Sequence, residues 1–305
     1  MKNLLSLEAA SADEIEALLM SAEELKHKRW AKDLSDDDLR DQCWALMFSK
    51  SSTRTRVSFE VGIRELGGSV MFLSSNQSQL GRGEPIKDTA RVMGRMVHGA
   101  VIRTFAQDDV EQFAEFSGIP TINALTDDEH PCQILADLLT MKEKLGGWDR
   151  RKVVFFGDGD CNVAKSWMWA AEHMGFELVI AAPEAFMPSA EYQQQFSASG
   201  VVSFTSDATA AATNADVLYT DVWVSMGKED ESADRLDVFQ PYQINDGIVT
   251  AAKSSALVMH CLPAYREKEI TEKVLEANAD TIFQQAENRL HAQKAVLKAV
   301  AGSGE

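Results

Sequence analysis

The chain has 305 residues, of which 45% are hydrophobic, and a formal net charge of −17 at pH 7. This length is sufficient for two domains with their own cores. The acidic balance argues against nucleic acid or an anionic membrane as partner. We expect a cytoplasmic protein with reduced thiols, because the N-terminus lacks a signal-peptide core and no apolar run approaches a membrane span.

Apolar runs alternate with helical patterns along almost the whole chain. Strands are predicted near 43–48, 69–73, 99–103, 119–124, 152–156, 176–181, 200–204, 216–220, 257–260 and 281–283. Helices are predicted at 11–28, 85–97, 109–117, 131–145, 164–174 and 287–300. This alternation predicts an α/β protein with parallel sheets flanked by helices, and ten strands fit two sheets better than one.

The predicted domain boundary lies near Gly146-Gly147, where a long helix ends and a basic pair leads into the next strand. We therefore expect a first domain over 1–147 and a second over 148–286. The final segment, 287–305, has no strand after it and is expected to pack back on the first domain.

The most informative segment is the turn at 48–56, Phe-Ser-Lys-Ser-Ser-Thr-Arg-Thr-Arg. It joins a predicted buried strand to a helix, so free backbone N–H groups and the positive end of a helix dipole are available. Arg54 and Arg56 add planar, permanently charged groups suited to phosphate oxygens. A basic surface turn is the alternative, but the acidic background and the position after a strand favour an anion site.

Other candidate site residues also lie at the ends of predicted strands or in the segments that follow them. They are Arg103, His130, Gln133, Asn162, Asp221, Ser225, Met226, Cys261 and Leu262. Two parallel sheets facing each other would gather these strand ends in one cleft. Taken alone, His130 and Asp221 could be caps, and Cys261 could be a buried filler. His260 could equally be support or site.

The segment Gly-Asp-Gly-Asp-Cys-Asn at 157–162 is not a dinucleotide fingerprint. Asn162 stands where a third glycine is needed, and Asp158 and Asp160 would repel a pyrophosphate. A ligand carrying an amine or amino-acid group suits this turn better. The chain also lacks a Walker A motif, and its four cysteines show no metal-ligand spacing, so we expect no cofactor and no metal.

Four motifs in order resemble the aspartate/ornithine carbamoyltransferase family over nearly the whole length. They are Ser-Thr-Arg-Thr-Arg at 52–56, His-Pro-Cys-Gln at 130–133, Asp-Val-Trp-Val-Ser-Met-Gly at 221–227 and His-Cys-Leu-Pro at 260–263. The last two point to ornithine as acceptor. The resemblance implies a carbamoyl-phosphate domain, an ornithine domain, a closing cleft between them and a homotrimer or a higher assembly of trimers.

The resemblance also implies a role for individual residues. Those expected to bind carbamoyl phosphate are Ser52, Thr53, Arg54, Thr55, Gln79 from a neighbouring subunit, Arg103, His130, Gln133 and Arg289. Those expected to bind ornithine are Asn162, Asp221, Ser225, Met226, Cys261 and Leu262. The expected catalytic residues are Arg103, His130 and Cys261. The chain departs from the family pattern at Cys161, where many members have asparagine, and at Lys165, where a small polar residue is common.

Three alternatives remain open at this stage. The same fold could carbamoylate putrescine, an N-acylated ornithine or aspartate. An NAD-dependent dehydrogenase would fit the alternating pattern but not the broken glycine-rich turn. A non-catalytic sensor of carbamoyl phosphate or an amino acid would bind its ligand without turnover.

Overall fold

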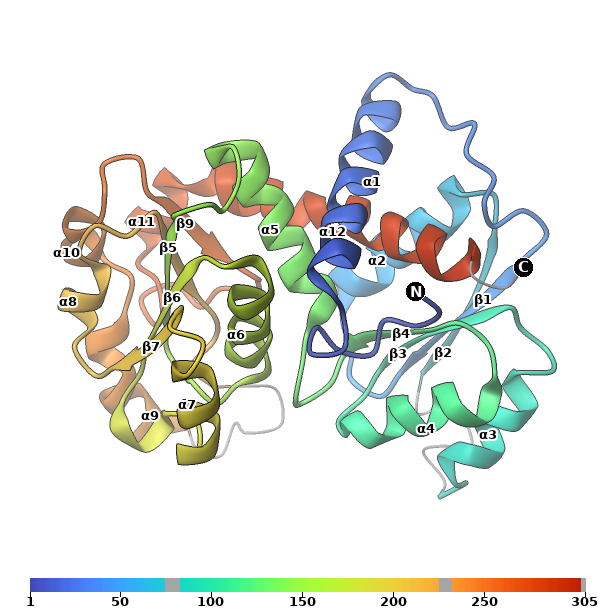
Figure 1. The fold of residues 1–305 in the computed structure, drawn as a ribbon, viewed down its shortest axis with the longest axis horizontal. Helices are drawn as coiled ribbons and strands as arrows, with labels where there is room; N and C mark the ends of the chain where they lie inside the picture. The colour runs from blue at the N-terminus through green and yellow to red at the C-terminus, as the bar shows by residue number, and fades with distance from the viewer. Residues whose placement is uncertain (75–82, 225–231, 303–305) are drawn as a thin grey trace. The chain divides into compact units, whose positions relative to one another are not determined.

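The computed structural model describes residues 1–74, 83–224 and 232–302, and it divides into two compact units (Figure 1). The first unit comprises Met1–Leu139 and Glu287–Glu305, and the second comprises Thr140–Ala286. The chain passes from one unit to the other inside α5 (Pro131–Leu145) and returns inside α12 (Ala279–Ala301).

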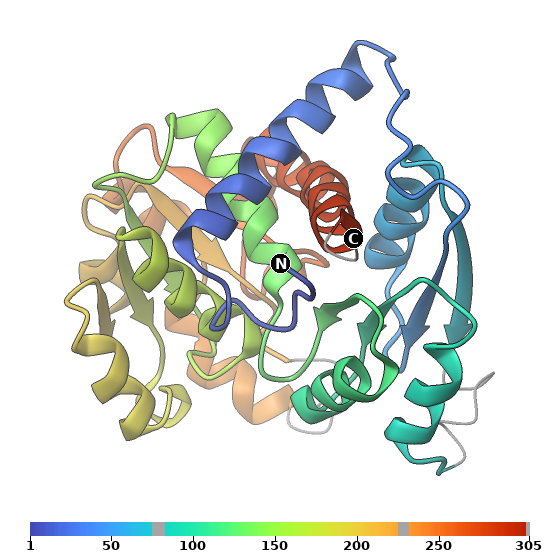
Figure 2. The same cartoon turned by 45° about the vertical axis from the view of Figure 1, so that its right-hand side comes forward.

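The first unit is built on a four-stranded parallel sheet with strand order β2-β1-β3-β4. Its strands are β1 (Cys43–Phe48), β2 (Ser69–Ser74), β3 (Gly99–Arg103) and β4 (Thr121–Leu125). Its helices, besides parts of α5 and α12, are α1 (Ala12–Trp30), α2 (Thr53–Glu65), α3 (Ile86–Met93) and α4 (Gln107–Ser117). Helices α3 and α4 cover one face of this sheet, whereas α2 and α12 lie on the other (Figures 1 and 2).

Alternating side chains of the first sheet fill the core beneath α3 and α4. Met47 and Ile102 pack there with Val110 and Phe113. On the opposite face the Trp44 ring lies against Gly99, where a Cβ atom would be only 2.5 Å from the ring. A glycine is therefore required at the start of β3, because any side chain would displace the buried indole.

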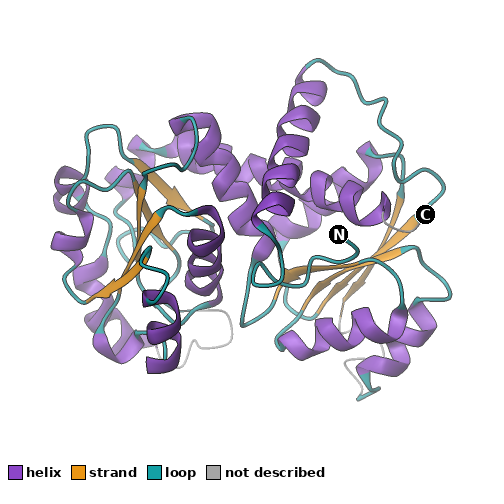
Figure 3. Ribbon diagram, viewed as in Figure 1, coloured by secondary structure: helices purple, strands orange, loops and turns teal. Residues whose placement is uncertain are grey.

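The second unit is built on a five-stranded parallel sheet with strand order β7-β6-β5-β8-β9 (Figure 3). Its strands are β5 (Lys152–Phe156), β6 (Glu177–Ala181), β7 (Val202–Thr205), β8 (Val217–Thr220) and β9 (Leu257–His260). Its helices are α6 (Asn162–Met174), η3 (Glu184–Phe186), α7 (Ala190–Ser197), α8 (Ala208–Ala212), α9 (Ser232–Phe239), η5 (Gln240–Tyr242), α10 (Asp246–Ala251) and α11 (Glu272–Ala277).

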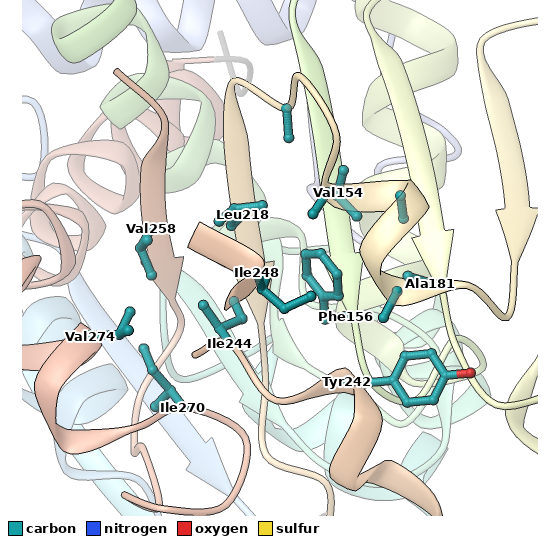
Figure 4. Close-up of a cluster of buried hydrophobic side chains, with 14 of the residues drawn as sticks. Val154, Phe156, Ala181, Leu218, Tyr242, Ile244, Ile248, Val258, Ile270 and Val274 are labelled. Atoms are coloured by element: carbon teal, nitrogen blue, oxygen red, sulfur yellow. The ribbon is translucent and has the colours of Figure 1, made fainter. Parts of the chain in front are cut away.

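Both faces of the second sheet are buried, which is why its strands read as continuous apolar runs. On one face Val154, Phe156 and Leu218 lie together with Ile244 and Ile248 (Figure 4). The intervening residues point to the other face. There Phe155 stacks on Tyr219, and Tyr219 meets the Trp167 ring of α6 edge-on.

The two parallel sheets flanked by helices confirm the predicted fold class. The predicted strand at 281–283 is wrong, because those residues belong to α12, which begins at Ala279 rather than near 287. None of the helices in the described part of the chain is both long and apolar enough to cross a membrane.

Candidate functional site

In the first unit, the turn after β1 opens helix α2 with an unusually cationic first turn. Ser52 is the N-cap, and its Oγ accepts the backbone N–H of Thr55 at 3.3 Å. The first turn carries no acidic residue, so the positive end of the helix dipole is not offset by a side chain. The Nε of Arg54 is buried and has no hydrogen-bond partner among the described residues. This geometry suits an anion.

Helix α12 brings a second arginine to the same turn. Arg289 is 4% exposed, and its Nη2 donates to the Oγ1 of the fully buried Thr55 at 2.7 Å. The Oγ of Ser52 donates to the same oxygen at 3.0 Å. The hydroxyl of Thr55 thus ties Arg289 to the beginning of α2, although the two residues are far apart in sequence.

A third arginine, Arg103, ends strand β3 and is also 4% exposed. The pairing of β3 with β4 shifts register between Ile102 and Arg103, and such an irregularity redirects the side chain at the end of a strand. The backbone carbonyl of Arg103 accepts the N–H of Ser49 at 2.8 Å. This bond holds the turn between β1 and α2 beside the end of β3.

His130 lies next to these arginines, immediately before α5. Burial, followed by the positive charges of Arg289 and Arg103, lowers the pKa of His130 well below its usual range. The imidazole is therefore neutral at pH 7, and it has one N–H to donate. Gln133, in the first turn of α5, donates from Nε2 to Asp137 at 2.8 Å, and its buried Oε1 has no partner within the described segments.

Arg56 does not join this group, contrary to the sequence-based expectation that both arginines of the turn serve an anion. Residues two apart on a helix point in very different directions. Arg56 forms an ion pair with Glu60 at 2.6 Å and lies over the Phe72 ring, 3.8 Å from its centroid. The other cation of the turn, Lys50, is paired with Asp127.

In the second unit, the predicted residues lie at the carboxyl ends of three neighbouring strands, β5, β8 and β9. Thr220 pairs with His260 across β8 and β9, so the residues that follow, Asp221 and Cys261, are brought together. The Cys261 thiol donates to Asp221 Oδ1 at 2.9 Å, and the same oxygen accepts the N–H of Val222 at 2.7 Å. Burial raises the pKa of the Asp221 carboxyl.

The turn after β5 completes this group. Cys161 is the N-cap of α6, and its thiol accepts the Ala164 N–H at 3.5 Å. Burial raises the pKa of the Cys161 thiol well above its usual range, and the charges of Asp158 and Asp221 raise it further. Asn162 follows as the first residue of α6. The Cys161 thiol is thus neutral and adds no charge to this turn.

His260 is a support for the turn that carries Cys261 and Leu262. Its Nδ1 accepts the backbone N–H of Leu262 at 2.9 Å, so that nitrogen carries no proton. Its Nε2 lies 3.0 Å from Glu269 Oε1 and must be the protonated nitrogen. Leu262 has φ of +57°, a left-handed conformation that costs a non-glycine residue about 1–2 kcal/mol. The bond to His260 helps to hold it there.

Asp221, His260 and Cys261 are also the one group in the described part of the chain whose donor atoms lie close enough together to ligate a metal ion. Both ring nitrogens of His260 are already used, and the thiol donates to Asp221. A cation would have to displace these bonds.

Three of the predicted site residues, Gln79, Ser225 and Met226, lie outside the described residues. Two residues that contact the predicted segments, Glu269 and Arg235, were not predicted from the sequence. Neither lies in a motif, and neither has an apolar pattern around it from which its burial could be predicted.

Comparisons with known proteins cover almost the whole chain. Residues 2–143 match the family model for the carbamoyl-P binding domain of aspartate/ornithine carbamoyltransferase, and residues 149–300 match the model for its Asp/Orn binding domain. An ornithine carbamoyltransferase from Akkermansia muciniphila is 57% identical over 303 residues, which are 99% of this chain and 98% of the relative.

Solved structures give the same result. The ornithine carbamoyltransferase from Pyrococcus furiosus superposes with a TM-score of 0.93 at 42% identity, covering 100% of this chain and 98% of that one. The anabolic ornithine carbamoyltransferase from Campylobacter jejuni gives a TM-score of 0.92 at 40% identity, covering 99% and 100%.

Proposed function

Because the chain belongs to the aspartate/ornithine carbamoyltransferase family, we propose that it transfers the carbamoyl group of carbamoyl phosphate to the δ-amine of L-ornithine. The products are L-citrulline and phosphate. The observation that carries the choice of acceptor is the partly buried carboxylate of Asp221, held beside the Cys261 thiol at the strand ends of the second unit.

Asp221 distinguishes the acceptor amines by charge. Ornithine brings a second amine, whose positive charge a buried carboxylate attracts. Aspartate would bring a second carboxylate against Asp221, and two like charges in a poorly solvated site repel strongly. Putrescine has two amines but lacks the α-carboxylate of ornithine. An N-acylated ornithine lacks the free α-amine.

The cationic half-site of the first unit suits carbamoyl phosphate. Arg54 and the N-terminus of α2, with Ser52, Thr53 and Thr55, would hold the phosphate, and Arg289 would approach it from α12. Arg103 and neutral His130 would donate to the carbonyl oxygen, where negative charge develops in the tetrahedral transition state. Gln133 would position the carbamoyl nitrogen through its buried Oε1.

The transfer makes one bond and breaks one bond. The δ-nitrogen attacks the carbonyl carbon, the bond from that carbon to the phosphate oxygen breaks, and the amine loses a proton. With an ordinary amine pKa of about 10.4, roughly one ornithine side chain in ~10³ is neutral at pH 7. Cys261 and Leu262 would flank the δ-amine, and Asn162 and Asp221 would hold the amino-acid end of ornithine.

The proposal extends to the quaternary structure of the protein and to its location in the cell. The family resemblance supports a homotrimer, or a higher assembly of trimers, with Gln79 reaching a neighbouring subunit's site. The four free cysteines suit a reducing compartment, which supports a cytoplasmic location. Sedimentation analysis tests the trimer, and a monomer at micromolar concentration would contradict it.

A panel of acceptors tests the function. The purified protein is incubated with carbamoyl phosphate and, separately, ornithine, putrescine, N-acetylornithine or aspartate, and both phosphate and the carbamoylated product are measured. We expect ornithine to give equimolar citrulline and phosphate, with kcat/KM about 10–100-fold above the others, since a hydrogen bond to a charged group is worth about 1.5–3 kcal/mol. A preference for any other acceptor would overturn the assignment.

A further inference from the structure

Arg235, which no motif includes, joins two segments of the second unit. It lies in α9 and is 5% exposed. Its Nη1 donates to the backbone carbonyl of Trp223 at 2.7 Å, and its Nη2 lies 3.0 Å from Asp158 Oδ2. Trp223 follows Asp221 after β8, and Asp158 precedes Cys161 after β5. One guanidinium therefore connects the two strand ends that carry the ornithine half-site.

Aromatic rings enclose this guanidinium. Its central carbon lies 4.7 Å from the Phe186 ring centroid and 5.7 Å from that of Phe239. Phe239 in turn stacks on Trp223. The side chains of Arg235 and Asp158 are 6% and 11% exposed, so solvent screens this pair far less than a surface pair. The site requires a planar cation that can stack on aromatic rings and donate hydrogen bonds to two partners at once. The ammonium group of lysine is not planar and lacks this fixed donor geometry.

Arg235 also determines which carboxylate of the half-site is left to receive a cation. Among the residues that the structure describes, three aspartates lie near these strand ends. Asp158 is paired with Arg235, and Asp160 is paired with Lys165 at 3.2 Å. Asp221 has no cationic side chain at salt-bridge distance among the described residues, and its bonds are to Cys261 and to the Val222 N–H. Of these three described carboxylates, the one without a cationic partner is therefore the one beside Cys261.

We propose that Arg235 is a positioning residue for the amino-acid substrate, which fixes the spacing between the β5 and β8 strand ends and neutralises Asp158. This inference rests on the proposed function, because it concerns binding of ornithine at the same half-site. Without Arg235 a second buried carboxylate would compete for the ammonium groups of ornithine, and the carbonyl of Trp223 would lose its donor.

The test compares Arg235→Met with Arg151→Met. Arg151 has the same bonding pattern at the amino ends of β5 and β8, where it pairs with Asp216 at 3.1 Å and donates to the Leu145 carbonyl at 2.7 Å. Steady-state assays at saturating carbamoyl phosphate give KM for ornithine and kcat, calorimetry gives Kd for carbamoyl phosphate, and thermal unfolding gives Tm.

We expect Arg235→Met to raise KM for ornithine about tenfold or more, the loss typical for a charged hydrogen bond. Its Kd for carbamoyl phosphate should stay within about twofold. Arg151→Met should lower Tm but leave KM within about twofold. The pair Arg235→Met and Asp158→Asn should be less than additive in KM, because Arg235 acts through Asp158.

Equal effects of the two arginine variants on KM, or no effect of Arg235→Met, would overturn the inference while leaving the proposed function intact. If the wild-type protein forms no citrulline, the proposed function fails and this inference fails with it. If Arg235→Met does not fold, Arg235→Lys decides instead. It should raise KM several-fold, and a wild-type KM in that variant would refute the role.

Discussion

At the scale of single residues, burial determines the charge state of the groups that would do the chemistry. Burial, together with the charges of Arg289 and Arg103, lowers the pKa of His130, so the neutral imidazole can donate a hydrogen bond to a carbonyl oxygen. Burial raises the pKa of Asp221, whose Oδ1 accepts from the Cys261 thiol. In the proposed reaction Cys261 would orient the substrate and would not act as a nucleophile.

Arg54 and Arg56 provide a matched pair of variants on one helix. Arg54→Ala should weaken carbamoyl phosphate binding by about 10–100-fold, because it removes charge-assisted hydrogen bonds to the phosphate. Arg56→Ala removes the same charge from a residue bound to Glu60 and Phe72, so Kd should change by less than about threefold. Calorimetry measures both, and equal losses would show that general charge, not a specific site, attracts the ligand.

The pH dependence of the reaction should follow the acceptor amine. Below the amine pKa of about 10.4, each pH unit raises the neutral fraction about tenfold, so kcat/KM for ornithine should rise about tenfold per unit from about pH 6 to 8. The lowered pKa of His130 means that this imidazole is already neutral across that range and adds no second step. A flat profile would contradict amine deprotonation as the controlling equilibrium.

At the scale of elements, the residues at the ends of strands could be predicted from the sequence. The distant side chains that hold those residues in place could not. The apolar runs in the sequence indicated that Arg103 ends one strand and that Asp221 and Cys261 follow two others, and the structure places them at the ends of β3, β8 and β9. Helix α12 was misread at 281–283 because it buries polar side chains, including Gln285 and Asn288, and so lacks the apolar stripe by which a helix is recognised.

The contacts among distant segments could not be predicted from local pattern. His260 was ambiguous because its roles depend on Glu269, which reaches it from beyond the turn. Arg289 and Thr55 meet only because α12 packs along α2, where Lys294 also pairs with Glu65 at 3.0 Å. Such contacts depend on tertiary packing, and a single sequence contains no periodic signal for them.

The His260 support gives a stability prediction. His260→Ala should lower the free energy of unfolding by about 2–3 kcal/mol, because it leaves the Leu262 N–H without its acceptor and the buried Glu269 carboxylate with only the Tyr265 N–H as a donor among the described residues. The control is His98→Ala. His98 also accepts a backbone N–H, from Cys43 at 3.0 Å, but at an exposed position, so its loss should be below about 1 kcal/mol. Urea unfolding measures both, and similar losses would refute the role of His260.

At the scale of the whole molecule, each unit presents the chemistry of one substrate. The first unit gathers three arginines, a neutral histidine and a helix N-terminus, which suit an anionic phosphate ester. The second gathers the Asp221 carboxylate and the thiols of Cys161 and Cys261, which suit a cationic amino acid. Direct transfer requires both substrates to be bound together, so the rate enhancement should come largely from holding them in contact.

The most direct measurement follows the carbamoyl carbon and the δ-nitrogen of ornithine, which the proposed reaction joins. The protein is given ¹³C-labelled carbamoyl phosphate and ornithine labelled with ¹⁵N at the δ-position, and the product is examined by NMR. We predict citrulline with a one-bond coupling between ¹³C and the δ-¹⁵N, formed at the rate of phosphate release. Phosphate release without that coupling, or ¹³C attached to the α-nitrogen, would contradict the proposed reaction.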